Sequence, residues 1–143
     1  MRMDRIEIRH DPAADIVLFT LIGEMTLDAI VRAGDGHFGP HGTANSVWDL
    51  RAANVSGIDV GALKEIAMRS REAAGRRRNP RTAHVVDDAG KRALLKLYEA
   101  VADPSSGIDL RSFRTLDEAY DWLLSGARPA FPAEPALVLE IEI

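Results

Sequence analysis

The sequence lacks cysteine, has few aromatic residues and contains no long hydrophobic run. The lack of cysteine excludes disulfides, thiolate zinc sites and cysteine nucleophiles. No apolar run approaches the roughly 18 residues that a membrane-spanning helix needs, and the first residues lack the apolar stretch of a secretory signal. We therefore expect a cytoplasmic protein that is not transmembrane. Its 143 residues are enough for one domain with its own core.

The sequence also lacks an excess of positive charge. Its formal net charge is -4, whereas a dedicated nucleic-acid binder presents a strongly basic face, so we expect no nucleic-acid partner. One basic run is the exception, and it contains Arg76, Arg77 and Arg78. These cations follow a predicted helix end at Gly75, where the helix dipole favours them in a solvated loop. The alternative is a patch that binds an acidic partner or anionic headgroups.

Short apolar segments alternate with amphipathic ones along most of the chain. This alternation is typical of βαβ units and predicts an α/β fold with a mixed, mainly parallel sheet flanked by helices. The predicted strands are 5–9, 16–22, 47–50, 82–86, 108–113 and 137–143, and the predicted helices begin near 27, 59, 89 and 115. The first two strands are expected to form an amino-terminal hairpin.

Several polar residues mark where the helices begin. Thr26 and Asp88 have the side chains and positions of helix N-caps, and Thr115 and Glu118 have the spacing of a capping box. Between the first helix and the third strand, residues 34–43 contain four glycines and one proline. This composition predicts a long surface loop, and the glycine spacing matches neither the P-loop nor the dinucleotide-binding fingerprint.

The end of the chain has a pattern of its own. Residues 1–126 form the predicted α/β domain, and residues 127–143 are a proline-rich extension followed by a carboxy-terminal strand. The alternating leucines and isoleucines of that strand need an apolar surface, so we expect it to join a sheet edge, either its own or that of a neighbouring subunit. A role for residues 136–143 in a homodimer follows from the second alternative.

Three carboxylates follow predicted strands and are the strongest candidates for chemistry. Asp49, Asp87 and Asp88 would lie at the carboxyl ends of parallel strands, where a trio of this kind can hold Mg²⁺ for phosphoryl transfer. Helix capping and loop hydrogen bonds explain the same residues more simply. We therefore expect no metal and no cofactor, and an Mg²⁺-dependent enzyme is the third functional hypothesis.

The histidines and serines form no recognisable catalytic set. His10 falls in a predicted turn, and His37 and His41 fall in the glycine-rich segment, where Gly39 and Pro40 exclude a helical metal pair. His84 lies inside a predicted strand and is best interpreted as a hydrogen-bonded core residue. No serine has the surroundings of a nucleophile elbow, so we expect no catalytic residue.

The order of elements resembles a known family. The resemblance rests on two amino-terminal strands, the strand Val47-Trp48-Asp49-Leu50-Arg51, a long helix, the strand 83–86 and the closing run Phe113-Arg114-Thr115-Leu116-Asp117-Glu118-Ala119-Tyr120-Asp121-Trp122-Leu123. Over residues 4–125 this pattern resembles the SpoIIAA-like family, which shares the STAS fold of anti-sigma-factor antagonists and is compared with CRAL-TRIO lipid-binding domains. The resemblance implies a non-enzymatic binding or regulatory module.

The resemblance also implies a docking surface for a protein partner at residues 54–63. In antagonists of this type a serine in that loop is phosphorylated, which adds charge at a helix N-terminus. Here Asp59 and Val60 occupy the positions of the serine pair, and Ser56 supplies the nearby hydroxyl. Ser56 is thus the phosphorylation candidate, although a helix cap or turn is its simpler role. The implied partner-binding residues are Asn54, Ser56, Gly57 and Asp59.

A second hypothesis is a carrier or sensor of a small apolar or lipid-like ligand. Such a ligand would lie between the sheet and two of the helices, with the basic run near its headgroup. The residues expected to hold it are Leu94, Tyr98, Trp122 and Leu123. Their helical spacing is equally explained by an ordinary core.

Overall fold

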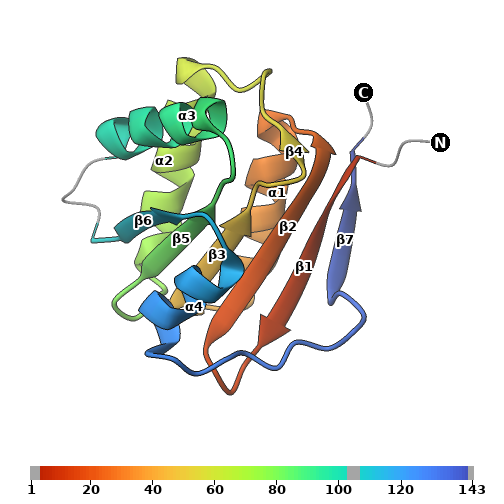
Figure 1. Ribbon diagram of the computed structural model, residues 1–143, viewed down its shortest axis with the longest axis vertical. Helices are drawn as coiled ribbons and strands as arrows, with labels where there is room; N and C mark the ends of the chain where they lie inside the picture. Colours follow the sequence, from red (N-terminus) through yellow and green to blue (C-terminus); the bar gives the residue numbers. More distant parts are fainter. Residues whose placement is uncertain (1–3, 103–106, 142–143) are drawn as a thin grey trace.

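A computed structural model describes residues 4–102 and 107–141 as an α/β fold (Figure 1). Its strands are β1 (Arg5–Asp11), β2 (Ile16–Glu24), β3 (Asn45–Asp49), β4 (Ala53–Asn54), β5 (Arg81–Val85), β6 (Asp109–Phe113) and β7 (Leu137–Glu140). Its helices are α1 (Leu27–Phe38), α2 (Val60–Ala74), α3 (Ala89–Val101) and α4 (Leu116–Leu124). The predicted α/β class is confirmed. Residues 142–143 of the predicted last strand lie outside the described residues.

The strands form one mixed sheet in the order β6-β5-β3-β2-β1-β7, with β4 paired to β2. Adjacent strands are parallel from β2 through β3 and β5 to β6. Strand β1, in contrast, is antiparallel to both of its neighbours, β2 and β7. The predicted hairpin of β1 and β2 is confirmed. Its turn is held by Asp11, whose Oδ1 accepts hydrogen bonds from the backbone of Ala13 and Ala14 at 3.1 and 3.3 Å.

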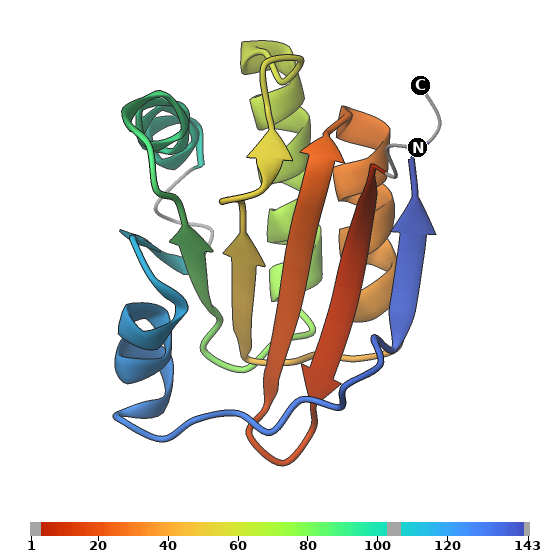
Figure 2. The same ribbon diagram turned by 45° about the vertical axis from the view of Figure 1, so that its right-hand side comes forward.

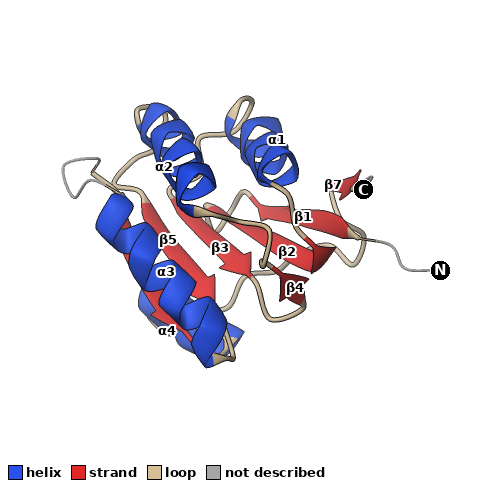
Figure 3. Ribbon diagram, turned by 90° about the horizontal axis from the view of Figure 1, so that it is seen from above, coloured by secondary structure: helices blue, strands red, loops and turns tan. Residues whose placement is uncertain are grey.

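Helices cover both faces of the sheet. Helices α1 and α2 lie together on one face, and α4 lies on the other (Figures 2 and 3). Helix α3 packs against α2, where Tyr98 joins Leu63 and Ala67 in one apolar cluster. The largest cluster lies between α1 and the strands β1 and β2, and in it the Phe19 ring stacks on Trp48 with centroids 3.9 Å apart. Among the described residues, no helix combines the length and apolarity needed to cross a membrane.

The predicted helix caps Thr26, Asp88 and Thr115 are confirmed, and Asp59 caps the remaining helix. The side chain of each cap residue accepts a hydrogen bond from the backbone N–H three residues later, and this satisfies one of the unpaired donors of the first turn. The cap residues are Thr26, Asp59, Asp88 and Thr115. Asp59, rather than Ser56, therefore caps α2.

The predicted loop 34–43 is wrong over its first half, because α1 continues to Phe38. His37 and Phe38 are 4% and 7% exposed and anchor the last turn in the core. Their burial outweighs the helix penalty of Gly34 and Gly36, which is about 1 kcal/mol each. Gly36 also allows a close approach, since a Cβ at this position would lie 3.3 Å from Cδ2 of Leu137 on β7.

The carboxy-terminal extension completes the chain's own sheet. The backbone N–H of Ala130 donates to Asp11 Oδ2 at 2.8 Å, and that of Ala136 donates to the Ile8 carbonyl, also at 2.8 Å. The extension then enters β7, which pairs with β1 in the register Ile6 to Leu139. Of the two predicted locations for this strand, the structure therefore shows the chain's own sheet edge.

Candidate functional site

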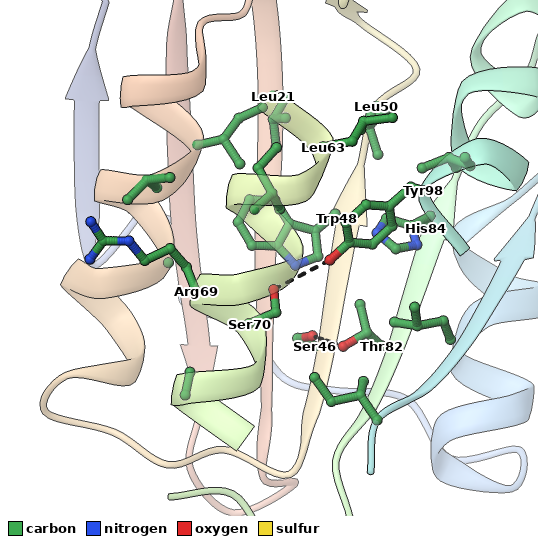
Figure 4. A pocket seen from close by; sticks show the side chains of 18 of the residues that line it. Leu21, Ser46, Trp48, Leu50, Leu63, Arg69, Ser70, Thr82, His84 and Tyr98 are labelled. Carbon is green, nitrogen blue, oxygen red and sulfur yellow. Dashed lines mark hydrogen bonds between the residues drawn. The ribbon is translucent and has the colours of Figure 1, made fainter. Parts of the chain in front are cut away.

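A cavity of about 100 Å³ lies between the sheet and helices α1, α2 and α3 (Figure 4). Its walls are mainly apolar, and they include Trp48 from β3, Leu63 from α2 and Leu94 from α3. An apolar cavity of about 150 Å³ in another protein is large enough to bind benzene. The present cavity is smaller than that, so only a molecule of about the size of one ring could fill it.

The pleat of β3 and β5 gives the cavity a partly polar floor. Successive side chains of a strand point to opposite faces, so Val47, Ala83 and Val85 pack with α4 on the far face. The intervening residues face the cavity, and the register pairs Ser46 with Thr82 and Trp48 with His84. Two short strands thus place hydroxyls and an imidazole below otherwise apolar walls.

The cavity hydroxyls hydrogen bond with one another. Ser46 Oγ and Thr82 Oγ1 are 2.9 Å apart on the floor, and Ser70 Oγ and Tyr98 Oη are 3.3 Å apart between α2 and α3 (Figure 4). Each pair satisfies polar groups that would be costly to bury alone. Burial raises the pKa of Tyr98, so its hydroxyl stays protonated at neutral pH.

His84 is the exception to this pairing. Its Nδ1 is buried and has no hydrogen-bond partner among the residues that the structure describes. Burial lowers the pKa of His84 to about 4, so the ring is neutral at pH 7. A neutral imidazole has one donor and one acceptor nitrogen, and an unpaired buried group costs about 1–3 kcal/mol. The expectation of a hydrogen-bonded core histidine is therefore wrong for Nδ1.

Arg77 also lines the cavity and does not belong to a surface patch. The residue is only 9% exposed, because its guanidinium turns inward to hold the segment before β3. Its Nε donates to the Thr43 carbonyl at 2.7 Å, and its Nη2 donates to the Ala44 carbonyl at 2.9 Å. The predicted patch of Arg76, Arg77 and Arg78 is therefore wrong for Arg77. Arg76 and Arg78 are exposed as expected.

The predicted partner-binding residues are exposed and run from Asn54, the last residue of β4, to Asp59, the cap residue of α2. Asn54 Oδ1 accepts a hydrogen bond from the Ser56 backbone at 3.0 Å, which makes Ser56 a turn residue. Asn54 and Ser56 also line an open groove of about 520 Å³, whose other side is the start of α3 with Lys91 and Leu94. Sequence reasoning did not place α3 beside this loop.

The three candidate carboxylates have structural roles. Asp49 is buried and forms two hydrogen bonds of 2.9 Å with the Arg51 guanidinium, which raises the pKa of Arg51. Asp88 caps α3, and Asp87 lies 3.8 Å from the Lys91 ammonium. Within residues 4–102 and 107–141, no group of three or more acidic, histidine or cysteine side chains is arranged to hold a metal ion.

Only half of the predicted ligand-holding residues reach the cavity. Leu94 and Tyr98 line it, but Trp122 and Leu123 lie in the cluster under α4, on the opposite face of the sheet. The Trp122 ring there lies below the Arg81 guanidinium, with Cζ 4.2 Å from the ring centroid. The sequence pattern could not tell which face of the sheet each helix covers.

A cluster of three histidines was not anticipated. His10 is in β1, not in a turn, and its ring centroid lies 4.9 Å from that of His37 and 4.8 Å from that of His41. His37 is buried and hydrogen bonds Thr43 Oγ1 through Nε2 at 2.8 Å. Burial, followed by the charges of His10, His41 and Arg77, lowers the pKa of His37 to about 3. The only signal in the sequence was that His37 and His41 stand four residues apart in the glycine-rich segment, and nothing in it indicated that His10 would join them.

Comparison with known proteins gives no match for this chain, either to a protein-family model or to a curated protein. Because a fold alone does not determine function, the functional assignment rests on the cavity, the groove and the residues that line them.

Proposed function

We propose that this protein binds a small, mainly apolar molecule in the cavity between the sheet and helices α1, α2 and α3. The observation that carries this proposal is the buried, unpaired Nδ1 of His84 in a largely apolar cavity. Ligand sites are typically concave and apolar, with a few polar groups that fix orientation. The role is that of a carrier or sensor, and it requires no catalytic residue.

The size of the cavity limits the ligand. Sites for drug-sized molecules measure about 300–1,000 Å³, whereas this cavity measures about 100 Å³. The ligand is therefore a single ring or a short branched chain. An entire membrane lipid is too large, which narrows the expected class of apolar or lipid-like ligands to its smallest members.

Phenol is a suitable probe because it combines one ring with one hydrogen-bonding group. We expect phenol to bind and to raise the melting temperature, because a ligand that binds only the folded state stabilises it. Ala73→Leu fills the cavity and should abolish both effects. Ala74→Leu is the matched control, since Ala74 is the next residue of α2 and does not line the cavity. Equal phenol binding by the two variants would contradict the proposal.

A second candidate function is the docking of a protein partner at the groove beside Ser56. The observation that favours it is the groove of about 520 Å³ that Asn54, Ser56 and Ile58 line, which is followed in the chain by the exposed start of α2, where Val60 is 44% exposed. This function fits the proposed SpoIIAA-like relationship and a cytoplasmic location. A photo-crosslinking residue at position 56 should capture a discrete partner that the same residue at position 78 does not. Identical products at both positions would contradict specific docking.

The proposed homodimer would use the free edge of β7. Leu137 and Val138 are 39% and 43% exposed on this last strand of the sheet, and an open edge can pair with another strand. Val138→Lys should shift a dimer toward monomer in sedimentation experiments. A dimer that survives this substitution would not use the β7 edge.

A further inference from the structure

Arg77 brings a buried positive charge to the cavity. Its guanidinium donors meet only neutral oxygens, namely the carbonyls of Thr43, Ala44 and Arg81 and the Ser46 hydroxyl. No carboxylate of the described residues lies within ion-pair distance of it, and these bonds use Nε and Nη2, so Nη1 makes none to a described residue. Burying a charge without an opposite charge is costly. Arg77 Cζ lies 4.6 Å from the centroid of the Phe38 ring, and the charge of the Asp15 carboxylate acts on it from beyond ion-pair distance. The cavity wall therefore holds a cation that has no direct ion pair among the described residues.

The sheet side of the cavity carries polar groups close to Arg77. Ser46 Oγ accepts from Arg77 Nη2 at 3.3 Å and hydrogen bonds Thr82 Oγ1 at 2.9 Å. Thr82 and His84 are two residues apart on β5 and point to the same face, which separates them by about 7 Å along the strand. The helices opposite contribute mainly apolar side chains, together with Asp35, Arg69 and the hydrogen-bonded hydroxyls of Ser70 and Tyr98. A ligand with one polar end and one apolar end matches this arrangement.

We propose that the cavity is a binding site for a small monocarboxylate with a compact apolar body, for which Arg77 supplies the counter-charge and His84 a hydrogen bond. The proposal rests on the proposed function and adds the chemical class of the ligand. A neutral alcohol or amide satisfies His84 but leaves Arg77 without an opposite charge. A carboxylate supplies the opposite charge for Arg77, where one of its oxygens can accept from Nη1, and its other oxygen can accept from the His84 ring; hydrogen bonds between charged groups are the stronger ones.

The test is calorimetric titration of the intact protein with benzoate, benzamide, isovalerate and isovaleramide. Each acid and its amide have nearly the same size, so the comparison isolates the charge. We expect each carboxylate to bind about tenfold or more tightly than its amide, because hydrogen bonds to charged groups are the stronger ones. Arg77→Gln should remove this preference, and Arg78→Gln, a change of the same charge at an exposed neighbour, should keep it.

The ligand series on the unsubstituted protein is decisive even where Arg77→Gln does not fold. Equal affinities for the acids and the amides would overturn the carboxylate assignment and leave the proposed function standing. Tighter binding of the amides would overturn it in the same way. Absence of binding by all four compounds, together with absence of phenol binding, would overturn the proposed function itself.

Discussion

Ser70 and Tyr98 join helices α2 and α3 through a hydrogen bond of 3.3 Å between their hydroxyl oxygens, at the wall of the cavity. The Tyr98 ring also meets His84 edge to face, with ring centroids 5.7 Å apart. One tyrosine thus connects the helix pair to the polar floor of the cavity.

The hydrogen bond between Ser70 and Tyr98 should contribute to stability in a measurable way. We expect Tyr98→Phe to lower the free energy of unfolding by about 1 kcal/mol, because the Ser70 hydroxyl loses its partner. In urea denaturation, Ser70→Ala in the Tyr98→Phe background should cost less than Ser70→Ala alone. Strictly additive effects would show that the two hydroxyls do not interact in solution.

His84 should be replaceable by an apolar residue without loss of stability. His84→Leu removes a buried nitrogen that has no partner in the described residues, so we expect the free energy of unfolding to rise by about 1 kcal/mol at pH 7. The same substitution should weaken phenol binding. Thr82→Val is a useful comparison, because it breaks an existing hydrogen bond and should destabilise. A large loss of stability in His84→Leu would contradict an unpaired nitrogen.

The free energy of unfolding should begin to fall at a pH above the range in which carboxylates titrate. The folded pKa values of His37 and His84, about 3 and about 4, lie below the usual value of 6.5. Groups with a lowered pKa bind protons more readily in the unfolded state, so their contribution is present above pH 6.5 and is lost as the pH falls toward 4 and then 3. We expect the free energy of unfolding to decline from pH 6.5 to 4.5, and His37→Gln to reduce that decline. A flat profile over this range would contradict neutral buried histidines.

Substitutions of two glycines test whether α1 extends into the segment that was predicted to be a loop. Gly34 is inside α1, and a Cβ there would meet no atom within 4 Å. Gly34→Ala should therefore raise the free energy of unfolding by about 1 kcal/mol. Gly36→Ala should gain less, because its Cβ would approach Leu137 at 3.3 Å. If residues 34–38 formed a loop, neither change would stabilise, and thermal unfolding of the two variants distinguishes these outcomes.

Local signals in the sequence predicted the elements of this fold well. Helix caps such as Thr26, Asp88 and Thr115 depend on residues within one turn, so they can be recognised from the sequence alone. The α/β alternation and the hairpin are likewise local patterns. The end of α1 was missed because burial of His37 and Phe38 is a tertiary effect that overrides glycine propensity.

The cavity required information that the sequence does not contain. Tyr98 and Trp122 each belong to the apolar stripe of an amphipathic helix, and the sequence does not distinguish the two stripes. In the structure α3 and α4 pack in different clusters, on different faces of the sheet. Arg77 stands between two exposed arginines, and only the path of the chain between α2 and β5 turns it inward. The geometry of the loop thus decides which of the three arginines is buried, and the composition of the sequence does not reveal that geometry.

The most direct measurement is an NMR experiment that locates bound phenol by intermolecular nuclear Overhauser effects on the isotope-labelled protein. The proposed binding predicts contacts from the phenol ring to the methyl groups of Leu63, Ile66 and Leu94, all of which line the cavity. Contacts instead to the methyl groups of Leu116 and Leu123, which pack on the opposite face, would contradict it. Saturating phenol without contacts to the cavity methyls would contradict it equally.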